Sequence, residues 1–222
     1  MIDLLNALVL LTNFIIVPAL AYGSQLALGA LGITLIYGIL RFSHFAHGDI
    51  MAFGTATVIL FTWFLQANGI GLGVLPTALL ALPFAILCTV AYLLAADRTV
   101  YRFYRKVRAK PITVVMASLG VMFVTNGLTR LLIGPGEQRF EDGERFIITV
   151  QAFRQWSGLA EGLTLRTAQG LTIGVALIAM ALLFWFLNRT KAGKSMRAYS
   201  DNEDLALLSG INPERVVLIT WT

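Results

Sequence analysis

The chain has 222 residues, of which 57% are hydrophobic and 13% are charged, and its formal net charge is +5. A soluble globular domain carries about 25% charged residues, so this composition excludes a soluble domain and indicates an integral membrane protein. The positive charge does not indicate a nucleic-acid partner, because the basic residues lie beside apolar runs, as in the cytoplasmic loops of membrane proteins.

Six apolar stretches and the start of a seventh follow one another along the chain. The six stretches cover residues 4–22, 24–40, 49–66, 74–96, 112–133 and 169–187. They predict an all-α polytopic bundle of about six transmembrane helices that forms one domain over residues 1–222. The seventh stretch, residues 216–222, is too short to span a bilayer, because a spanning helix needs about 20 residues. We therefore expect a fragment or a shortened form that is incomplete at its C-terminus.

The charges of the connecting segments predict an orientation. Residues 97–110 and 189–197 are rich in Lys and Arg, so both are expected in the cytoplasm. Residues 134–169 carry more acids than bases and form the expected extracytoplasmic loop, in which residues 146–150 favour a strand pair or an interfacial helix. Counting back along the spans places residues 41–49 on the cytoplasmic side.

The first apolar stretch can be placed in the membrane in two ways. If it spans the membrane, the N-terminus lies inside. Asn6, Asn13 and Pro18 interrupt its apolar character, so it can instead lie shallow in the membrane or be kinked. No basic residue precedes it, and a cleaved signal peptide is therefore not expected.

The link between the second and third stretches, residues 41–49, places ionisable groups between two membrane-length runs. It reads RFSHFAHGD and contains both histidines of the chain, His44 and His47. Two histidines do not complete a metal site, so none is expected. Gly48 favours broken backbone beside a translocation path. The alternative is a simple cytoplasmic turn in which Asp49 caps the next helix.

Residues 189–215 form the second informative region. They predict a basic segment directly after the membrane span, and then a short helix that Ser200 or Asp201 caps. Gly210 suits the position after the end of that helix, and Asn212 caps the next one.

The short helix combines acidic and apolar side chains. Glu203 and Asp204 suit its first turn, and Leu205, Ala206 and Leu208 form an apolar edge. A helix–glycine–helix corner of this kind can serve as a docking surface for another protein. The alternative is an ordinary surface helix.

Residues 193–195 read Gly-Lys-Ser, like the end of a phosphate-binding loop. The full pattern needs a glycine at position 188, which is Asn, and a preceding strand, where a membrane span is predicted instead. We therefore expect no ATP site and no enzymatic activity in this chain.

Together these segments resemble the LivH-type permeases of branched-chain amino acid ABC importers. The resemblance is closest at Phe45–Asp49, whereas Ser43 and His44 replace a common Ile-Asn pair. Further similar positions are Ala117–Gly120, Asn126, Gly134, Pro135, Thr190, Gly193, Arg197, Ala198, Ala206, Gly210, Ile211 and Asn212.

The resemblance implies a multi-pass subunit of the bacterial plasma (inner) membrane that carries branched-chain or other hydrophobic amino acids. It further implies two cytoplasmic ATP-binding subunits, a second homologous permease, and a periplasmic or lipid-anchored substrate-binding protein. Membrane lipid is the remaining expected partner, with no cofactor, metal or catalytic residue.

The same resemblance implies two sets of functional residues. The residues expected to form the translocation path or hinge are Tyr37, His44, Phe45, His47, Gly48, Asp49 and Asn126. The residues expected to couple to the ATPase, within the cytoplasmic coupling loop 189–215, are Arg197, Glu203, Ala206, Gly210, Asn212 and Pro213.

Three alternatives stay open. A permease of a urea or short-chain amide importer has a similar sequence. A stand-alone secondary transporter or channel is disfavoured, because the apolar stretches contain almost no charge. An intramembrane enzyme that uses His44, His47 and Asp49 lacks a convincing nucleophile and base.

Overall fold

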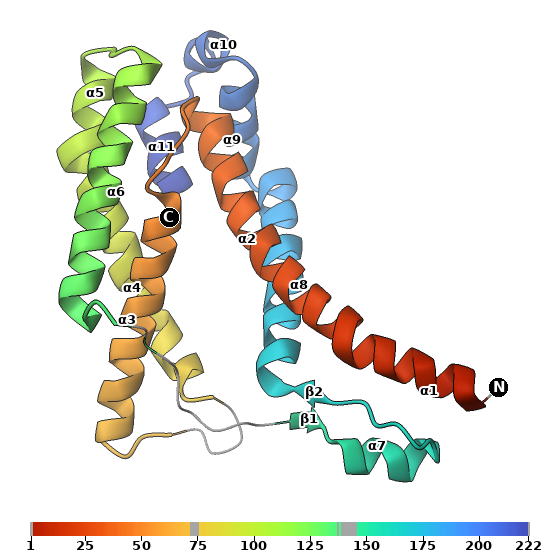
Figure 1. The fold of residues 1–222 in the computed structure, drawn as a ribbon. Helices are drawn as coiled ribbons and strands as arrows, with labels where there is room; N and C mark the ends of the chain where they lie inside the picture. Colours follow the sequence, from red (N-terminus) through yellow and green to blue (C-terminus); the bar gives the residue numbers. More distant parts are fainter. Residues whose placement is uncertain (1, 72–75, 137, 139–145, 222) are drawn as a thin grey trace. The chain divides into compact units, whose positions relative to one another are not determined.

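Long apolar helices dominate the structure, which is a computed structural model (Figure 1). It describes residues 2–71, 76–136, 138 and 146–221. In that part of the chain, five helical segments are long and apolar enough to cross a membrane. They are Asp3–Leu40, His47–Ala67, Ala78–Lys106, Pro111–Ile133 and Thr167–Arg189. The all-α polytopic class predicted from the sequence is confirmed.

The first two predicted stretches are one helical segment. We expected separate spans at 4–22 and 24–40, but Asp3–Leu40 is continuous over 38 residues, so the described chain has five candidate spans and not about six. At a rise of about 1.5 Å per residue this segment is about 57 Å long, nearly twice the hydrocarbon thickness of a bilayer.

A π-helical turn interrupts this long segment. It consists of α1 (Ile2–Leu11), the turn η1 (Thr12–Ile16) and α2 (Val17–Leu40). The turn ends two residues before Pro18, whose nitrogen has no hydrogen to donate to the helix. A π turn shifts the hydrogen-bond register by one residue, which accommodates the proline without ending the helix.

The backbone breaks after α2, as the sequence predicts. Residues 41–46 are not helical, Arg41 adopts a left-handed φ of 54°, and α3 (His47–Ala67) begins after them. Asp49 lies in the first turn of α3, but the N-cap is Ala46 and no side chain caps the helix. The alternative in which Asp49 caps α3 is therefore wrong.

The next helical segment extends beyond its predicted end. It runs through α4 (Ala78–Ala96), a second π turn η2 (Asp97–Tyr101) and α5 (Arg102–Lys106), so most of the expected loop 97–110 is helical. The following helix is α6 (Pro111–Ile133), which has a proline in its first turn.

The described part of the long loop between α6 and α8 contains a strand pair, which its sequence favours, and a short helix. Strand β1 (Phe146–Ile148) pairs antiparallel with β2 (Leu165–Arg166), and α7 (Val150–Ser157) lies between them in sequence. The Thr149 hydroxyl accepts a hydrogen bond from the amide of Ala152 and caps α7.

Four helices complete the chain: α8 (Thr167–Arg189), α9 (Lys191–Asp201), α10 (Glu203–Leu208) and α11 (Pro213–Trp221). The predicted cap of the short helix is wrong by one or two residues. Ser200 and Asp201 end α9, and the Asn202 side chain caps α10 by accepting from the amide of Leu205 at 3.0 Å. Gly210 has a φ of +79°, as expected for a glycine that follows a helix.

The chain divides into two compact units, and each is described by itself. The first combines Met1–Leu31 with Asp142–Trp185, and the second combines Gly32–Glu141 with Phe186–Thr222. In the second unit α3 packs against α4 and α6. Its buried core includes Ile36, Phe42, Ala46, Ile50, Tyr101, Val121, Val217 and Trp221.

Gly193, at the junction of α8 and α9, allows a close backbone contact. A Cβ atom there would lie 2.5 Å from the Cα atom of Leu187, and backbone cannot yield as a flexible side chain can. Gly193→Ala should therefore lower the thermal unfolding midpoint of the detergent-solubilised chain, at a cost of about 1–3 kcal/mol. The matched control is Gly174→Ala in α8, where nothing lies within 4 Å and alanine favours the helix. Equal midpoints for the two variants would contradict the contact.

Candidate functional site

Predicted functional residues gather at two places in the second unit. One is the link, residues 41–49, together with the helices around it. The other is the corner, residues 189–215, which is made of α9, α10 and the start of α11. The structure places each predicted residue at one of these two places or on a helix beside it.

His44 is the centre of the link. Its side chain is 6% exposed, and its Nε2 atom lies 2.8 Å from the hydroxyl oxygen of Tyr101. Its ring also lies edge-on to Trp221, with centroids 5.2 Å apart, while Tyr101 and Trp221 stack on each other at 5.3 Å. An aromatic box made by η2, α11 and the link therefore encloses this histidine.

The environment of His44 favours its neutral form. Burial, and next the nearby His47, lower the pKa of His44 from 6.5 to about 4. At neutral pH the ring is therefore uncharged, and it can accept a hydrogen bond at one nitrogen while it donates at the other.

His47 faces α2 across a close contact. A Cβ atom at Gly32 would lie 2.7 Å from the Cε1 atom of the His47 ring. The two histidine rings have centroids 6.5 Å apart. The link thus brings His44 and His47 near each other, and a glycine in α2 makes room for the second ring.

The link is also tied to α6. The Phe45 amide donates to the Ser118 hydroxyl at 3.3 Å, and the Asn126 side-chain amide donates to an Asp49 carboxylate oxygen at 2.9 Å. Two of the predicted path residues, Asp49 and Asn126, therefore meet although 77 positions separate them. The side chains of Tyr37 and Phe45 and the backbone at Gly48 are exposed, and the structure does not gather them with the histidines.

The start of the link is joined to the corner. The Arg41 guanidinium donates to the Ser200 backbone oxygen at 2.8 Å, and the Ser200 hydroxyl donates to the Gly38 backbone oxygen at the same distance. The end of α9 is thus fixed to the end of α2.

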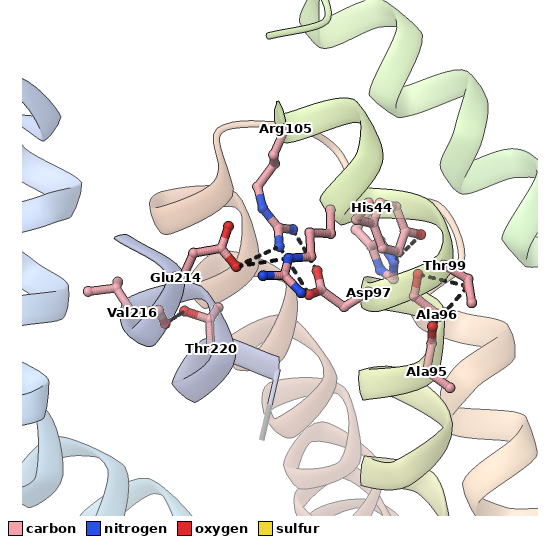
Figure 2. A network of polar contacts seen from close by, with 11 residues as sticks. His44, Ala95, Ala96, Asp97, Thr99, Arg105, Glu214, Val216 and Thr220 are labelled. Atoms are coloured by element: carbon pink, nitrogen blue, oxygen red, sulfur yellow. Dashed lines mark hydrogen bonds and ion pairs between the residues drawn. The ribbon is translucent and has the colours of Figure 1, made fainter. Parts of the chain in front are cut away.

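An ion network joins α11 to the helical segment that includes η2 and α5. Asp97 is 4% exposed, and both of its carboxylate oxygens accept from the Arg105 guanidinium. Glu214 lies 3.5 Å from Arg102 Nε and 4.0 Å from Arg105 Nη2. Figure 2 shows Arg105 between the two acids, with His44 close by.

The sequence does not predict this network, because residues 97–110 read as a basic loop in which no pairing of Asp97 with Arg105 is expected. They are eight residues apart, which on a regular α-helix separates two side chains by about 80° around the axis. The extra residue of the π turn η2 brings them into register, since residues seven apart share a face over two turns. The sequence does not predict a role for Tyr101 either, because this residue also lies in the expected loop 97–110.

The corner presents apolar side chains outward. Leu205, Leu207 and Leu208 are all exposed, and Leu208 is 85% exposed. Ala206 is instead buried against α9 and α11.

The other predicted coupling residues stabilise the corner or lie at its surface. The Tyr199 hydroxyl donates to Glu203 at 2.7 Å, and burial together with this bond raises the pKa of Tyr199. Arg197 is exposed and donates to the Asn188 side-chain oxygen. The Asn212 side chain accepts from the Glu214 amide at 3.0 Å and so caps α11, in which Pro213 is the first residue.

The described residues include no group of three or more His, Cys, Asp or Glu side chains that could hold a metal ion. Residues 193–195 lie inside α9, where the amide of Lys194 bonds the Thr190 backbone oxygen and that of Gly193 bonds the Thr190 hydroxyl. These amides are engaged in a helix start and do not form a phosphate cradle.

Comparison with known proteins indicates the type of protein that carries such features. A family model described as "Branched-chain amino acid transport system / permease component" matches residues 15–222. The chain is 29% identical, over 90% of its length, to the high-affinity branched-chain amino acid transport system permease protein LivH of Escherichia coli K12, of which it covers 62%. No solved structure matches the chain significantly.

Two further relatives agree with this comparison. The LivH protein of Salmonella typhimurium is 28% identical over 90% of the chain, and the BraD protein of Pseudomonas aeruginosa, a permease protein of the same kind of system, is 25% identical over 93%. The chain covers 62% and 64% of these two relatives, so it spans less than two thirds of their length.

The burial of His44 predicts a pH dependence of stability. Because the folded-state pKa lies below the unfolded value, the contribution is present above pH 6.5 and is lost as the pH falls to about 4. Its size is about 3 kcal/mol at most. Thermal midpoints of the detergent-solubilised chain should fall over this range by more in the wild type than in His44→Gln. Parallel pH profiles for the two proteins would contradict the burial of His44 as a neutral ring.

Proposed function

Because the chain belongs to the family of permease components of branched-chain amino acid transport systems, we propose that it is the membrane-spanning subunit of an ABC importer. Its substrate is a branched-chain amino acid, and it resides in the bacterial inner membrane. Two cytoplasmic ATP-binding subunits, a second permease and an extracytoplasmic binding protein complete the importer. The chain itself transports and does not catalyse a reaction.

This proposal rests mainly on the geometry of the corner. Three exposed leucines lie on α10, and Glu203 and Asp204 lie in its first turn. Residues 193–195 are helical and form no nucleotide-binding loop, which agrees with energy supplied by a separate subunit. An apolar and acidic short helix fits a groove of an ATP-binding subunit, which supplies that energy through contact.

The proposal implies an orientation of the chain in the membrane, in which the chain crosses the bilayer five times. Asn13 accepts hydrogen bonds from the Thr164 amide at 3.2 Å and from its hydroxyl at 2.6 Å, and Asn6 accepts from the Glu161 amide. These partners belong to the loop 134–169, whose charge balance favours the outside. The N-terminal turns therefore lie at the outer surface.

The remaining part of the first segment is long enough for one crossing. Helix α2 has 24 residues, which is about 36 Å, and the link follows it, beginning with Arg41. Five crossings then place the link, α5 and the corner in the cytoplasm, where their Lys and Arg residues are expected. Of the two placements that the sequence left open for the first stretch, this favours the shallow one, with the N-terminus outside.

Labelling of introduced cysteines tests the orientation. Cys88 is the only cysteine, so Cys88→Ala gives a cysteine-free background for Asp3→Cys and Lys106→Cys. A membrane-impermeant maleimide added to intact cells should label position 3 and leave position 106 unlabelled until the membrane is permeabilised. Protection of position 3 in intact cells would instead place the N-terminus inside.

Substitution of Gly210 tests the coupling role of the corner in the reconstituted importer. Gly210 has a φ of +79° and donates its amide hydrogen to the Leu207 backbone oxygen, and proline permits neither feature. Gly210→Pro should reduce ATP-driven leucine uptake at least tenfold while the chain still inserts into the membrane.

The matched control is Gly210→Asn, because asparagine tolerates left-handed backbone and keeps the amide hydrogen. This variant should retain most of the uptake. Full uptake by the proline variant would contradict the coupling role. If the wild-type importer takes up urea or short amides but no branched-chain amino acid, the related importer class replaces the one proposed.

A further inference from the structure

An open pocket lies beside the link in the second unit. Its volume is about 590 Å³, and its walls come from α2, α3, α4 and α11. Most of the lining is aliphatic and includes Leu35, Ile50, Met51, Val58, Ile86 and Leu93. Pockets of about 300–1,000 Å³ with apolar walls and a few polar groups are typical of small-molecule sites.

The hydroxyl groups in the walls do not make the pocket polar. Thr55, Thr89 and Thr220 each donate to the backbone oxygen four residues earlier in their own helix. These bonds occupy the hydroxyl hydrogens, so the long wall of the pocket offers van der Waals contact more than hydrogen bonding.

The link end of the pocket has a different character. His44 and Trp221 both line it, and they are only 6% and 3% exposed. The Nδ1 atom of His44 and the Nε1 atom of Trp221 have no hydrogen-bond partner in the part of the chain that the structure describes. A buried polar atom without a partner is costly, and a native structure usually satisfies it with a ligand or water.

These two atoms define the chemistry of a ligand. The indole N–H only donates, so it requires an acceptor such as a carboxylate oxygen. The His44 ring bonds Tyr101 through Nε2, which leaves Nδ1 to accept from or donate to the same ligand. The ring centroids of His44 and Trp221 are 5.2 Å apart, and both residues line the pocket, so their unpartnered nitrogens belong to the same end of it.

We propose that this pocket binds an α-amino acid, with its polar end at His44 and Trp221 and its branched aliphatic side chain between α3 and α4. This inference deepens the proposed function and rests on it for the role of the pocket as a stage in transport. Urea and short amides lack an aliphatic body, and they would leave the apolar wall unused.

The position of Trp221 also connects the pocket with the corner. Trp221 is the last residue of α11, whose first residue, Pro213, lies three positions after Gly210. A displacement of the corner moves this short helix, and with it the indole N–H that the amino acid binds. Release of the substrate can in this way follow nucleotide-driven movement of α10.

Photo-crosslinking tests the pocket directly in the assembled importer, in nanodiscs without the binding protein. The probe is a leucine analogue whose branched side chain carries a diazirine. It should label peptides from α3 and α4, and excess leucine should compete for labelling whereas excess urea should not. Label confined to other segments, or equal competition by urea, would overturn the inference.

Two pairs of variants sharpen the test. Trp221→Phe keeps an aromatic ring but removes the N–H, and it should raise the half-saturating probe concentration about tenfold. Trp185→Phe, at an exposed position of α8, should leave it unchanged. Ile86→Trp should fill the pocket from α4 and abolish labelling, whereas Leu87→Trp, next to it but outside the lining, should not. Wild-type labelling by Trp221→Phe and Ile86→Trp would refute the site.

The outcome separates this inference from the proposed function. ATP-driven leucine uptake by an importer whose probe labels elsewhere would refute the pocket and leave the function intact. Leucine-competed labelling of α3 and α4 without any ATP-driven uptake would support the amino-acid site and refute the importer role.

Discussion

The ion pair between Asp97 and Arg105 is the constraint on which the end of the second unit that carries the link and the corner depends. A carboxylate that is 4% exposed must be paired, and removal of one partner from such a pair costs about 3–5 kcal/mol. The extra residue of the π turn η2 brings these two residues, which are eight apart, closer to one face of the helical segment. The same turn directs Tyr101 toward His44, so one local irregularity positions both the ion network and the aromatic box.

Helix α11 connects the corner with the apolar pocket beside the link. Glu214, in its first turn, lies beside Arg102 and Arg105, and Trp221 at its end packs on Tyr101 and His44. In the proposed mechanism, a movement of α10 would pass through Gly210 into α11 and so reach the apolar pocket. The chain thus provides the path of the substrate and transmits the movement of α10. The ATP-binding subunit provides the energy.

Composition and apolar runs were enough to predict the fold class, because a bilayer requires long apolar helices. The break after Leu40 and the positive φ of Gly210 also followed from residue types. The continuous helix through Pro18 and the helical course of residues 97–106 did not, because a π turn leaves no clear pattern in a single sequence.

The two candidate sites were predictable to different degrees. The sequence singled out His44, His47, Asp49 and Asn126, and the structure brings them together in two pairs. Their enclosing partners Tyr101 and Trp221 come from distant segments, and no local spacing relates them to the link. The burial of Ala206, predicted as an outward contact residue, depends on how α10 packs against α9 and α11.

Cross-linking at Leu208 tests whether α10 docks on a cytoplasmic ATP-binding subunit. In the cysteine-free background, Leu208→Cys should cross-link to the ATP-binding subunit of the assembled importer, and the yield should change when ATP is added. Val107→Cys, an exposed apolar position outside the corner, should give no such product. Absence of the Leu208 product, together with labelling of position 208 from outside intact cells, would contradict the account.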